Sequence, residues 1–140
     1  MKLHHVGIAV KSLKDAVPIF EKLLGCSPVC TERVEGQKVR VAVFGVGGSR
    51  IELLEAESAE SPIARFIAKR GQGMHHLTLT VPDLEQALVE MERSGIRAID
   101  RQPRVGAGNR RIAFLQPQST AGVLIELMEE SNKGEGTRTE

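Results

Sequence analysis

The chain has 140 residues, of which 41% are hydrophobic and 26% charged, and its formal net charge at pH 7 is +1. These values are ordinary for one soluble globular domain, and the small net charge argues against a nucleic-acid partner. The chain has four Phe and no Trp or Tyr, which also argues against stacking platforms for bases. We find no membrane span and no signal-peptide pattern, so we expect a cytoplasmic protein that does not bind membranes.

The first half of the chain predicts a strand, a helix and three further strands. In the first strand, period-2 alternation places His5, Gly7 and Ala9 on one face. Ser12 is suited to cap the helix, which carries an apolar stripe. The expected elements are a strand at 3–10, a helix at 13–24 and strands at about 27–34, 38–46 and 49–55.

A second helix links the two halves of the chain. Ser61 and Pro62 form a helix start, with a capping hydroxyl before a proline in the first turn. The helix should run to Arg70 and end at Gly71. We therefore place a linker at 61–71.

The second half repeats the order of the first. The expected elements are a strand at 74–81, a helix at 84–94 and strands at about 96–102, 109–116 and 122–129. Beyond them, residues 131–140 are polar and contain Gly, so we expect this tail to be disordered.

The repeat extends to individual residues. His-His precedes the first strand's alternating run at His4-His5 and recurs at His75-His76, and Ile-Glu-Leu recurs at Glu52 and Glu126. The chain therefore reads as two copies of a βαβββ module, at 1–58 and 73–130. Each copy alone would bury a poor core, so we expect one domain over 1–130. The predicted class is α+β, with two tandem βαβββ modules forming a partly open, barrel-like metal cleft.

The repeated residues suggest a metal site. By strand parity, His5, Glu52, His76 and Glu126 all lie on the sheet faces that the module helices leave uncovered. Nitrogen and oxygen ligands without thiolate suit Mn²⁺, Fe²⁺, Co²⁺, Ni²⁺ or Zn²⁺. The alternative is structural histidines and solvent-facing glutamates. The adjacent histidines, at 4 and 75, face the opposite way by parity, and we expect them to pack or hydrogen-bond, with support of the metal ligands as the alternative.

A glycine-containing loop precedes the seventh predicted strand. Its members Gly106, Gly108, Asn109 and Arg110 lack the lysine and the following helix of a P-loop. One interpretation is a hairpin turn with exposed arginines. The other is a substrate-binding loop whose amides and arginines hold an anionic group.

At this point the sequence resembles a known family. The paired modules and the His/Glu/His/Glu set resemble the vicinal oxygen chelate superfamily, which includes glyoxalase I, extradiol dioxygenases and bleomycin-resistance proteins. Within it, several segments resemble the methylmalonyl-CoA epimerases. These segments are residues 5–10, 51–54, 61–64 with Phe66, 73–76, 106–107, 114–115 with Pro117, and 122–127.

The resemblance implies both a ligand set and a reaction. It implies that His5, His76 and Glu126 bind one divalent metal ion per chain, with Glu52 at a position that is Gln or Glu in relatives. Co²⁺ is favoured over Mn²⁺, Ni²⁺ and Zn²⁺. The implied reaction is epimerisation of methylmalonyl-CoA, an acyl-CoA substrate, by proton transfer at C2. Glu126 is our first choice for one acid/base role and Glu52 for the other. Relatives are commonly dimers, which implies a homodimer.

Some relatives carry a separate glutamate in the third strand of module one, and residues 38–41 here contain none. The identity of the second acid/base is therefore open at this stage. Two other functions also remain open. One is a glyoxalase I-like isomerase (lactoylglutathione lyase) that uses the same metal set, and the other is a non-catalytic resistance-type protein that binds a small molecule.

Overall fold

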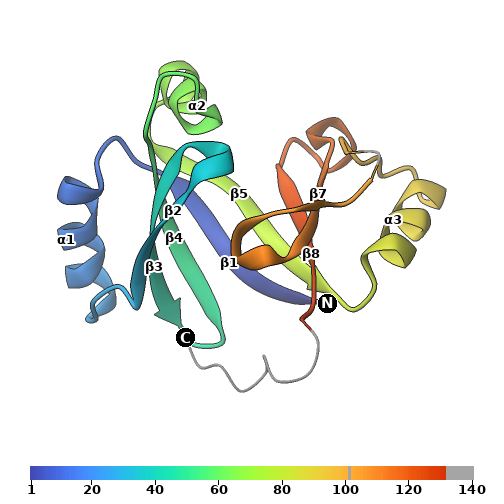
Figure 1. Ribbon diagram of the computed structural model, residues 1–140, viewed down its shortest axis with the longest axis horizontal. Helices are drawn as coiled ribbons and strands as arrows, with labels where there is room; N and C mark the ends of the chain where they lie inside the picture. Colours follow the sequence, from blue (N-terminus) through green and yellow to red (C-terminus); the bar gives the residue numbers. More distant parts are fainter. Residues whose placement is uncertain (101, 132–140) are drawn as a thin grey trace. The chain divides into compact units, whose positions relative to one another are not determined.

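The computed structural model describes residues 1–100 and 102–131 (Figure 1). Its α-helices are α1 (Leu13–Leu24), α2 (Pro62–Arg70) and α3 (Leu84–Arg93). Its strands are β1 (Lys2–Ala9), β2 (Cys30–Val34), β3 (Val39–Val46), β4 (Ser49–Ala56), β5 (Gly73–Val81), β6 (Arg104–Val105), β7 (Arg111–Leu115) and β8 (Ile125–Glu129). The β-α-β-β-β order thus occurs twice, as predicted, and the class is α+β. The predicted disordered tail lies outside the described residues from 132 onward.

The chain divides into two compact units. Residues His5–His75 form one, called here the His5 unit, and Met1–His4 together with the residues from His76 onward form the other, called the His76 unit. The boundaries fall inside β1 and β5, between the two histidines of each His-His pair. Across the described ranges, none of the helices has the length and apolar character that a membrane span requires.

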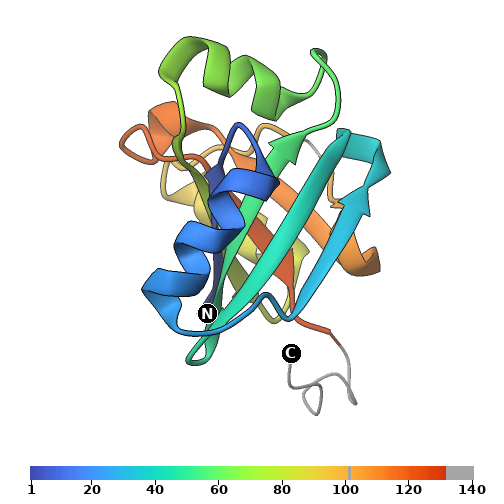
Figure 2. The same cartoon turned by 90° about the vertical axis from the view of Figure 1, so that its left-hand side faces the viewer.

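The His5 unit contains a four-stranded sheet in the order β2-β3-β4-β1. β1 and β4 are parallel, and the other neighbours are antiparallel. Helix α1 lies against one face of this sheet (Figure 2), and the buried side chains of Val10, Ala16, Phe44 and Leu53 join helix and sheet in one apolar cluster. This is the face that strand parity predicted for the helix.

The opposite face of the same sheet is covered in part, which corrects the prediction that it is bare. Ala9 and Leu54 are buried there in a second cluster with Ile63 of α2. Phe66 and Ile67 of α2 pack against the same cluster. The linker helix has an apolar stripe of its own, and it buries that stripe on the sheet face that the β-α-β-β-β pattern leaves without a helix.

The N-terminus of α2 depends on a buried cap. Ser61 is 0% exposed, and its hydroxyl accepts a hydrogen bond from the Ile63 amide at 3.1 Å. We expect Ser61→Ala to lower the free energy of unfolding by about 1–2 kcal/mol, because it leaves a buried N–H unpaired. Denaturant unfolding measures this loss, with the exposed Ser27→Ala as control. Equal unfolding midpoints for the two variants would contradict the role of the cap.

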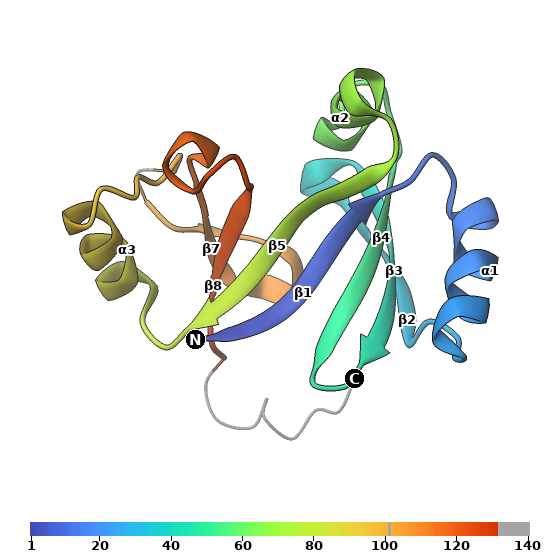
Figure 3. The ribbon, with the colours of Figure 1, turned by 180° about the vertical axis from the view of Figure 1, so that it is seen from behind.

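The His76 unit repeats the arrangement with the order β5-β8-β7-β6. β5 and β8 are parallel, and β8-β7 and β7-β6 are antiparallel. Helix α3 belongs to this unit (Figure 3), and its Leu84 is buried with Val81, Ala113 and Leu127 of the sheet. The predicted helix at 84–94 is confirmed to within one residue.

The predicted strand at about 96–102 is wrong over its described residues. Only an isolated bridge, Ala98 to Leu115, remains, and the strand β6 begins later. The reason is a side chain: the Phe114 amide donates to the Asp100 carboxylate at 2.9 Å instead of to a backbone carbonyl. A side-chain carboxylate thus takes the place of one backbone acceptor between the strands. Hydrophobic periodicity does not reveal this kind of competition.

Both modules fix their helix to the sheet in the same way. The first amide of α1, at Leu13, donates to the Glu55 carboxylate at 2.9 Å, and the first amide of α3, at Leu84, donates to Glu129 at 3.0 Å. Each of these glutamates lies three residues after Glu52 or Glu126 on β4 or β8. A carboxylate at a helix N-terminus is favourable, so the duplicated strand positions its helix as well as its candidate ligand.

Candidate functional site

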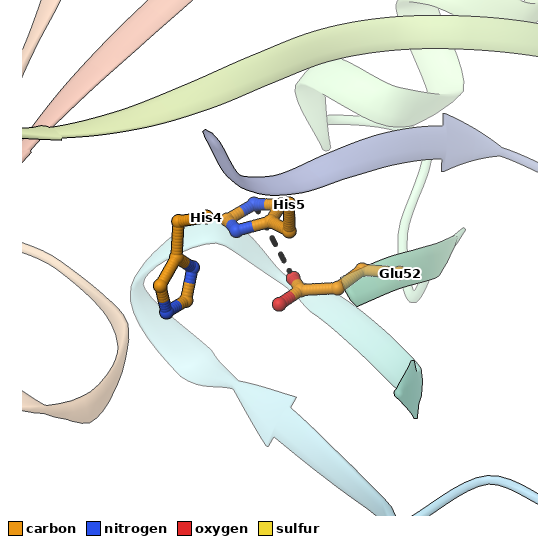
Figure 4. A group of neighbouring side chains, drawn as sticks. All are labelled: His4, His5 and Glu52. Carbon is orange, nitrogen blue, oxygen red and sulfur yellow. Dashed lines mark ion pairs between the residues drawn. The ribbon is translucent and has the colours of Figure 1, made fainter. Parts of the chain in front are cut away.

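His5 and Glu52 form the first candidate pair, in the His5 unit. They lie on the neighbouring parallel strands β1 and β4, and Gly7 is the register partner of Glu52. His5 Nε2 lies 3.5 Å from a Glu52 oxygen, and the two side chains are 6% and 15% exposed (Figure 4). Two polar side chains are therefore held together on a largely buried sheet face, which is typical of a site rather than of solvated surface.

His4 precedes His5 on β1 and lies near this pair (Figure 4). One ring nitrogen of His4 falls within 4.8 Å of ligand atoms of His5 and Glu52. Strand parity predicts that consecutive side chains point to opposite faces, and it does not anticipate this proximity.

His76 and Glu126 form the second candidate pair, in the His76 unit. They come from the parallel strands β5 and β8, and Thr78 is the register partner of Glu126. His76 Nε2 lies 3.9 Å from Glu126 Oε1, with side chains 10% and 9% exposed. The ring of Phe114 meets the His76 ring edge to face at a centroid distance of 6.4 Å. The second module thus reproduces the histidine-to-glutamate relation of the first.

The Glu126 carboxylate has a buried hydrogen-bond donor. The Thr78 hydroxyl donates to Glu126 Oε1 at 2.5 Å. Burial raises the pKa of Glu126, and the Thr78 hydrogen bond and the charge of Arg104 offset part of that rise. A carboxyl whose pKa is raised by burial is a candidate for proton transfer near neutral pH.

Sequence reasoning missed a cation beside Glu126. The Arg104 guanidinium lies over the Phe114 ring at 5.5 Å and pairs with the Asp100 carboxylate at 3.6 Å. Its side chain is 56% exposed, so it presents charge to solvent at the edge of the candidate pair. The sequence held no signal for this position, because Arg104 lies on β6 outside any motif that the sequence offered.

The predicted glycine-containing loop joins β6 to β7 as a hairpin. The Gly106 amide donates to the Arg110 carbonyl at 2.7 Å, and the Asn109 amide donates to the Gly106 carbonyl at 3.2 Å. Gly108 and Asn109 have positive φ values of 68° and 64°, as a tight turn requires. Arg110 is half-buried and donates to the Glu129 carbonyl. The loop is therefore a hairpin turn, as one interpretation predicted, but Arg110 is not exposed as that interpretation expected. Two of the amides considered for substrate binding are engaged within the loop.

His75 packs against the linker helix, one of the two structural roles expected for it, although the partner was not predicted. Its ring meets the Phe66 ring edge to face, with 5.0 Å between centroids. Burial lowers the pKa of His75, because the charged imidazolium is poorly solvated there. Its packing against α2 separates its role from that of its neighbour His76.

An open groove of about 630 Å³ lies elsewhere in the His5 unit, near the β3 and β4 residues Arg40 and Glu55. These two residues are register partners, and by strand period they share the α1 face, opposite to Glu52. Other cations of the groove are paired: Arg33 with Glu57 at 2.9 Å, and Lys38 with Glu60 at 2.8 Å. The groove lies on the other sheet face from Glu52, and the cations named above are paired with glutamates, so it is not part of the candidate site.

The donor atoms of each pair suit a divalent cation. His5 and Glu52 in one unit, and His76 and Glu126 in the other, are candidate metal ligands. Two ligand atoms at about 2.1 Å from a shared ion lie at most about 4.2 Å apart. The separations of 3.5 Å and 3.9 Å therefore each fit chelation by one pair.

Comparison with known proteins gives the chain its relatives. Residues 4–114 match the Glyoxalase/Bleomycin resistance protein/Dioxygenase superfamily model. An uncharacterised Bacillus subtilis protein is 44% identical over 128 residues, with 91% of each chain covered. Human mitochondrial methylmalonyl-CoA epimerase is 32% identical, with 90% of this chain and 72% of that protein covered. The crystal structure of methylmalonyl-CoA epimerase from Mycobacterium tuberculosis matches with a TM-score of 0.86 at 36% identity, covering 94% of this chain and 89% of that one.

Proposed function

The chain belongs to the Glyoxalase/Bleomycin resistance protein/Dioxygenase superfamily, and on that premise we propose that it is a metal-dependent methylmalonyl-CoA epimerase. The observation that carries the proposal is a buried His–Glu pair repeated at equivalent positions of two modules. It occurs in a chain whose relatives over most of its length include methylmalonyl-CoA epimerases. The proposed reaction interconverts the (2R) and (2S) epimers.

The proposed ligand set is His5, Glu52, His76 and Glu126, two from each module. We propose that they hold one divalent ion per chain, with Co²⁺ favoured and Mn²⁺, Ni²⁺ or Zn²⁺ as substitutes. When bound, such an ion supplies Lewis-acid stabilisation for negative charge on the thioester oxygen. The buried pairs support this assignment, because carboxylates in a low-dielectric setting need a positive partner.

Glu126 is the proposed acid/base on one side of the substrate. Its carboxylate takes the proton from C2, the electrons of the C–H bond move into the adjacent carbonyl system, and the thioester oxygen gains the charge. Return of a proton to the other face of C2 completes the inversion. The buried position of Glu126 supports this role, because burial raises the pKa of its carboxyl above the ordinary range and so makes the carboxylate a stronger base.

Glu52 is the proposed acid/base on the other side. The β3 residues that share its sheet face are Gly45 and the buried Val39, Val41 and Val43, with Val43 as its register partner. That face of β3 therefore carries no carboxylate to replace the glutamate that some relatives have in this strand. Glu52 is close to His5 and 15% exposed, which supports its choice among the acidic residues of the His5 unit.

The acyl-CoA substrate needs a cationic contact as well. We propose that the loop with Gly106, Gly108, Asn109 and Arg110 contacts an anionic part of the substrate, with Arg104 on the adjoining strand β6. The exposed guanidinium of Arg104 beside Phe114 supports this. The same resemblance leads us to propose a homodimer in the cytoplasm, which size-exclusion chromatography and cell fractionation test.

Two assays on the purified protein test the function. We expect rapid interconversion of the methylmalonyl-CoA epimers, followed by chiral analysis of the hydrolysed acids, and no turnover of the glutathione–methylglyoxal hemithioacetal. The reverse preference would identify a glyoxalase I-like isomerase instead. Absence of both activities, with tight binding of a small ligand, would identify a non-catalytic binding protein.

A further inference from the structure

The two modules differ at one position beside the candidate glutamate. In each module, the residue two places after the histidine is the register partner of the glutamate on the neighbouring parallel strand. In β1 and β4 this partner of Glu52 is Gly7, and in β5 and β8 the partner of Glu126 is Thr78. The duplication thus places a hydrogen atom beside one glutamate and a hydroxyl-bearing side chain beside the other.

The contact between Thr78 and Glu126 is short and fully enclosed. Thr78 is 0% exposed, Glu126 is 7% exposed, and the hydroxyl lies 2.5 Å from Oε1. This distance is in the range of charge-assisted O–H···O⁻ bonds, which are about twice as strong as neutral ones. A β-branched residue is stiff at χ1, so the hydroxyl has a fixed direction. The terminal torsion of a glutamate is soft, and this bond therefore sets the plane of the carboxylate.

We infer that Thr78 is a positioning residue that holds the Glu126 carboxylate in one orientation for metal binding. The inference rests on the proposed function, since it concerns how Glu126 serves as a ligand. Thr78 lies outside the proposed ligand set. The first module has no counterpart to it, because the equivalent residue, Gly7, has no side chain. Three polar or charged groups of the His76 unit act on the pKa of Glu126: Thr78, Arg104 and Asp100. Of these three, only Thr78 lies on a strand that pairs directly with β8.

Isosteric replacement of Thr78 isolates the hydroxyl. We expect Thr78→Val to weaken Co²⁺ binding by about 10- to 100-fold, the usual effect of losing the partner that orients a ligand. Thr78→Ser, which keeps the hydroxyl, should retain most of the affinity. Titration calorimetry with Co²⁺ gives the dissociation constant, and the visible absorption of bound Co²⁺ reports any change in ligand geometry.

The matched control lies on the same strand and face. Thr80 is 7% exposed, and its register partner is Met128, so Thr80→Val removes a hydroxyl with an apolar neighbour. It should leave both Co²⁺ affinity and absorption unchanged. If Thr78→Val does not fold, comparing Thr78→Ser with Thr78→Ala gives the same answer, because those two variants differ only in the hydroxyl.

Parental Co²⁺ affinity and absorption in Thr78→Val, or equal losses in Thr78→Ser and Thr78→Ala, would overturn the positioning role. A parent protein that binds no Co²⁺ would also overturn it. These readouts need no acyl-CoA. A protein inactive on methylmalonyl-CoA that still shows the hydroxyl-dependent Co²⁺ affinity would therefore refute the proposed substrate and support Thr78.

Discussion

Glu126→Gln is expected to lower the rate of methylmalonyl-CoA epimerisation by about 10²- to 10⁴-fold, the usual contribution of a positioned acid/base. Glutamine keeps the shape of the side chain and an oxygen that accepts from the Thr78 hydroxyl, but it cannot take a proton from C2. The two-sided mechanism makes a sharper statement about isotope exchange. In D₂O, the epimer whose C2 hydrogen faces Glu52 should still exchange that hydrogen, without inversion.

Glu52→Gln should give the reciprocal pattern, with exchange retained only for the other epimer. Proton NMR of each purified epimer in D₂O follows both processes, with rates expressed per bound metal ion so that loss of a ligand is not mistaken for loss of the base. The exposed Glu130→Gln on the segment after β8 is the control. Deuterium entering C2 of both epimers at parental rates in Glu126→Gln would remove Glu126 from the chemistry.

The sequence was sufficient for the architecture because the duplication doubles every signal. A helix start such as Ser12 or Asp83 is weak evidence alone, although each side chain does accept a hydrogen bond from the amide of the third residue of its helix. Its recurrence after the same histidine-bearing strand makes the module boundaries clear. Strand parity then places Ile51 and Leu53 against α1 and Glu52 on the other face, and the apolar clusters confirm the placement of the two apolar residues.

The sequence could not reveal interactions that depart from the regular hydrophobic pattern of the strands and helices. Asp100 replaces a backbone acceptor, and so the predicted strand around it does not form. The linker helix covers sheet surface near Leu54 that the module pattern leaves open. Thr78 sits on the face that parity predicts, yet its bond to Glu126 depends on the pairing register of β5 with β8. Thr78 and Glu126 are 48 residues apart, so no short turn between their strands fixes the pairing register.

Removal of the metal is expected to abolish the epimerase activity. After exhaustive chelation, with metal loss verified by elemental analysis, turnover should disappear and return when one equivalent of Co²⁺ per chain is restored. The reason is electrostatic: the charge that develops on the thioester oxygen needs a fixed cation in a site that excludes water. Full activity in verified metal-free protein would refute the metal mechanism while leaving the proton-transfer roles of the glutamates to be tested.

The adjacent histidines of β5 supply a matched test of which side chain binds the ion. His76→Ala should weaken Co²⁺ binding by more than the roughly 100-fold that loss of an orienting partner costs, because it removes a proposed ligand. His75→Phe should bind Co²⁺ as the parent does, since the ring packs on Phe66 and phenylalanine preserves that contact. At free Co²⁺ of 100 times its dissociation constant, linkage raises the free energy of unfolding by about 2.7 kcal/mol. Denaturant unfolding should show this gain in the parent and in His75→Phe and not in His76→Ala, and equal gains in all three proteins would exclude His76 as a ligand.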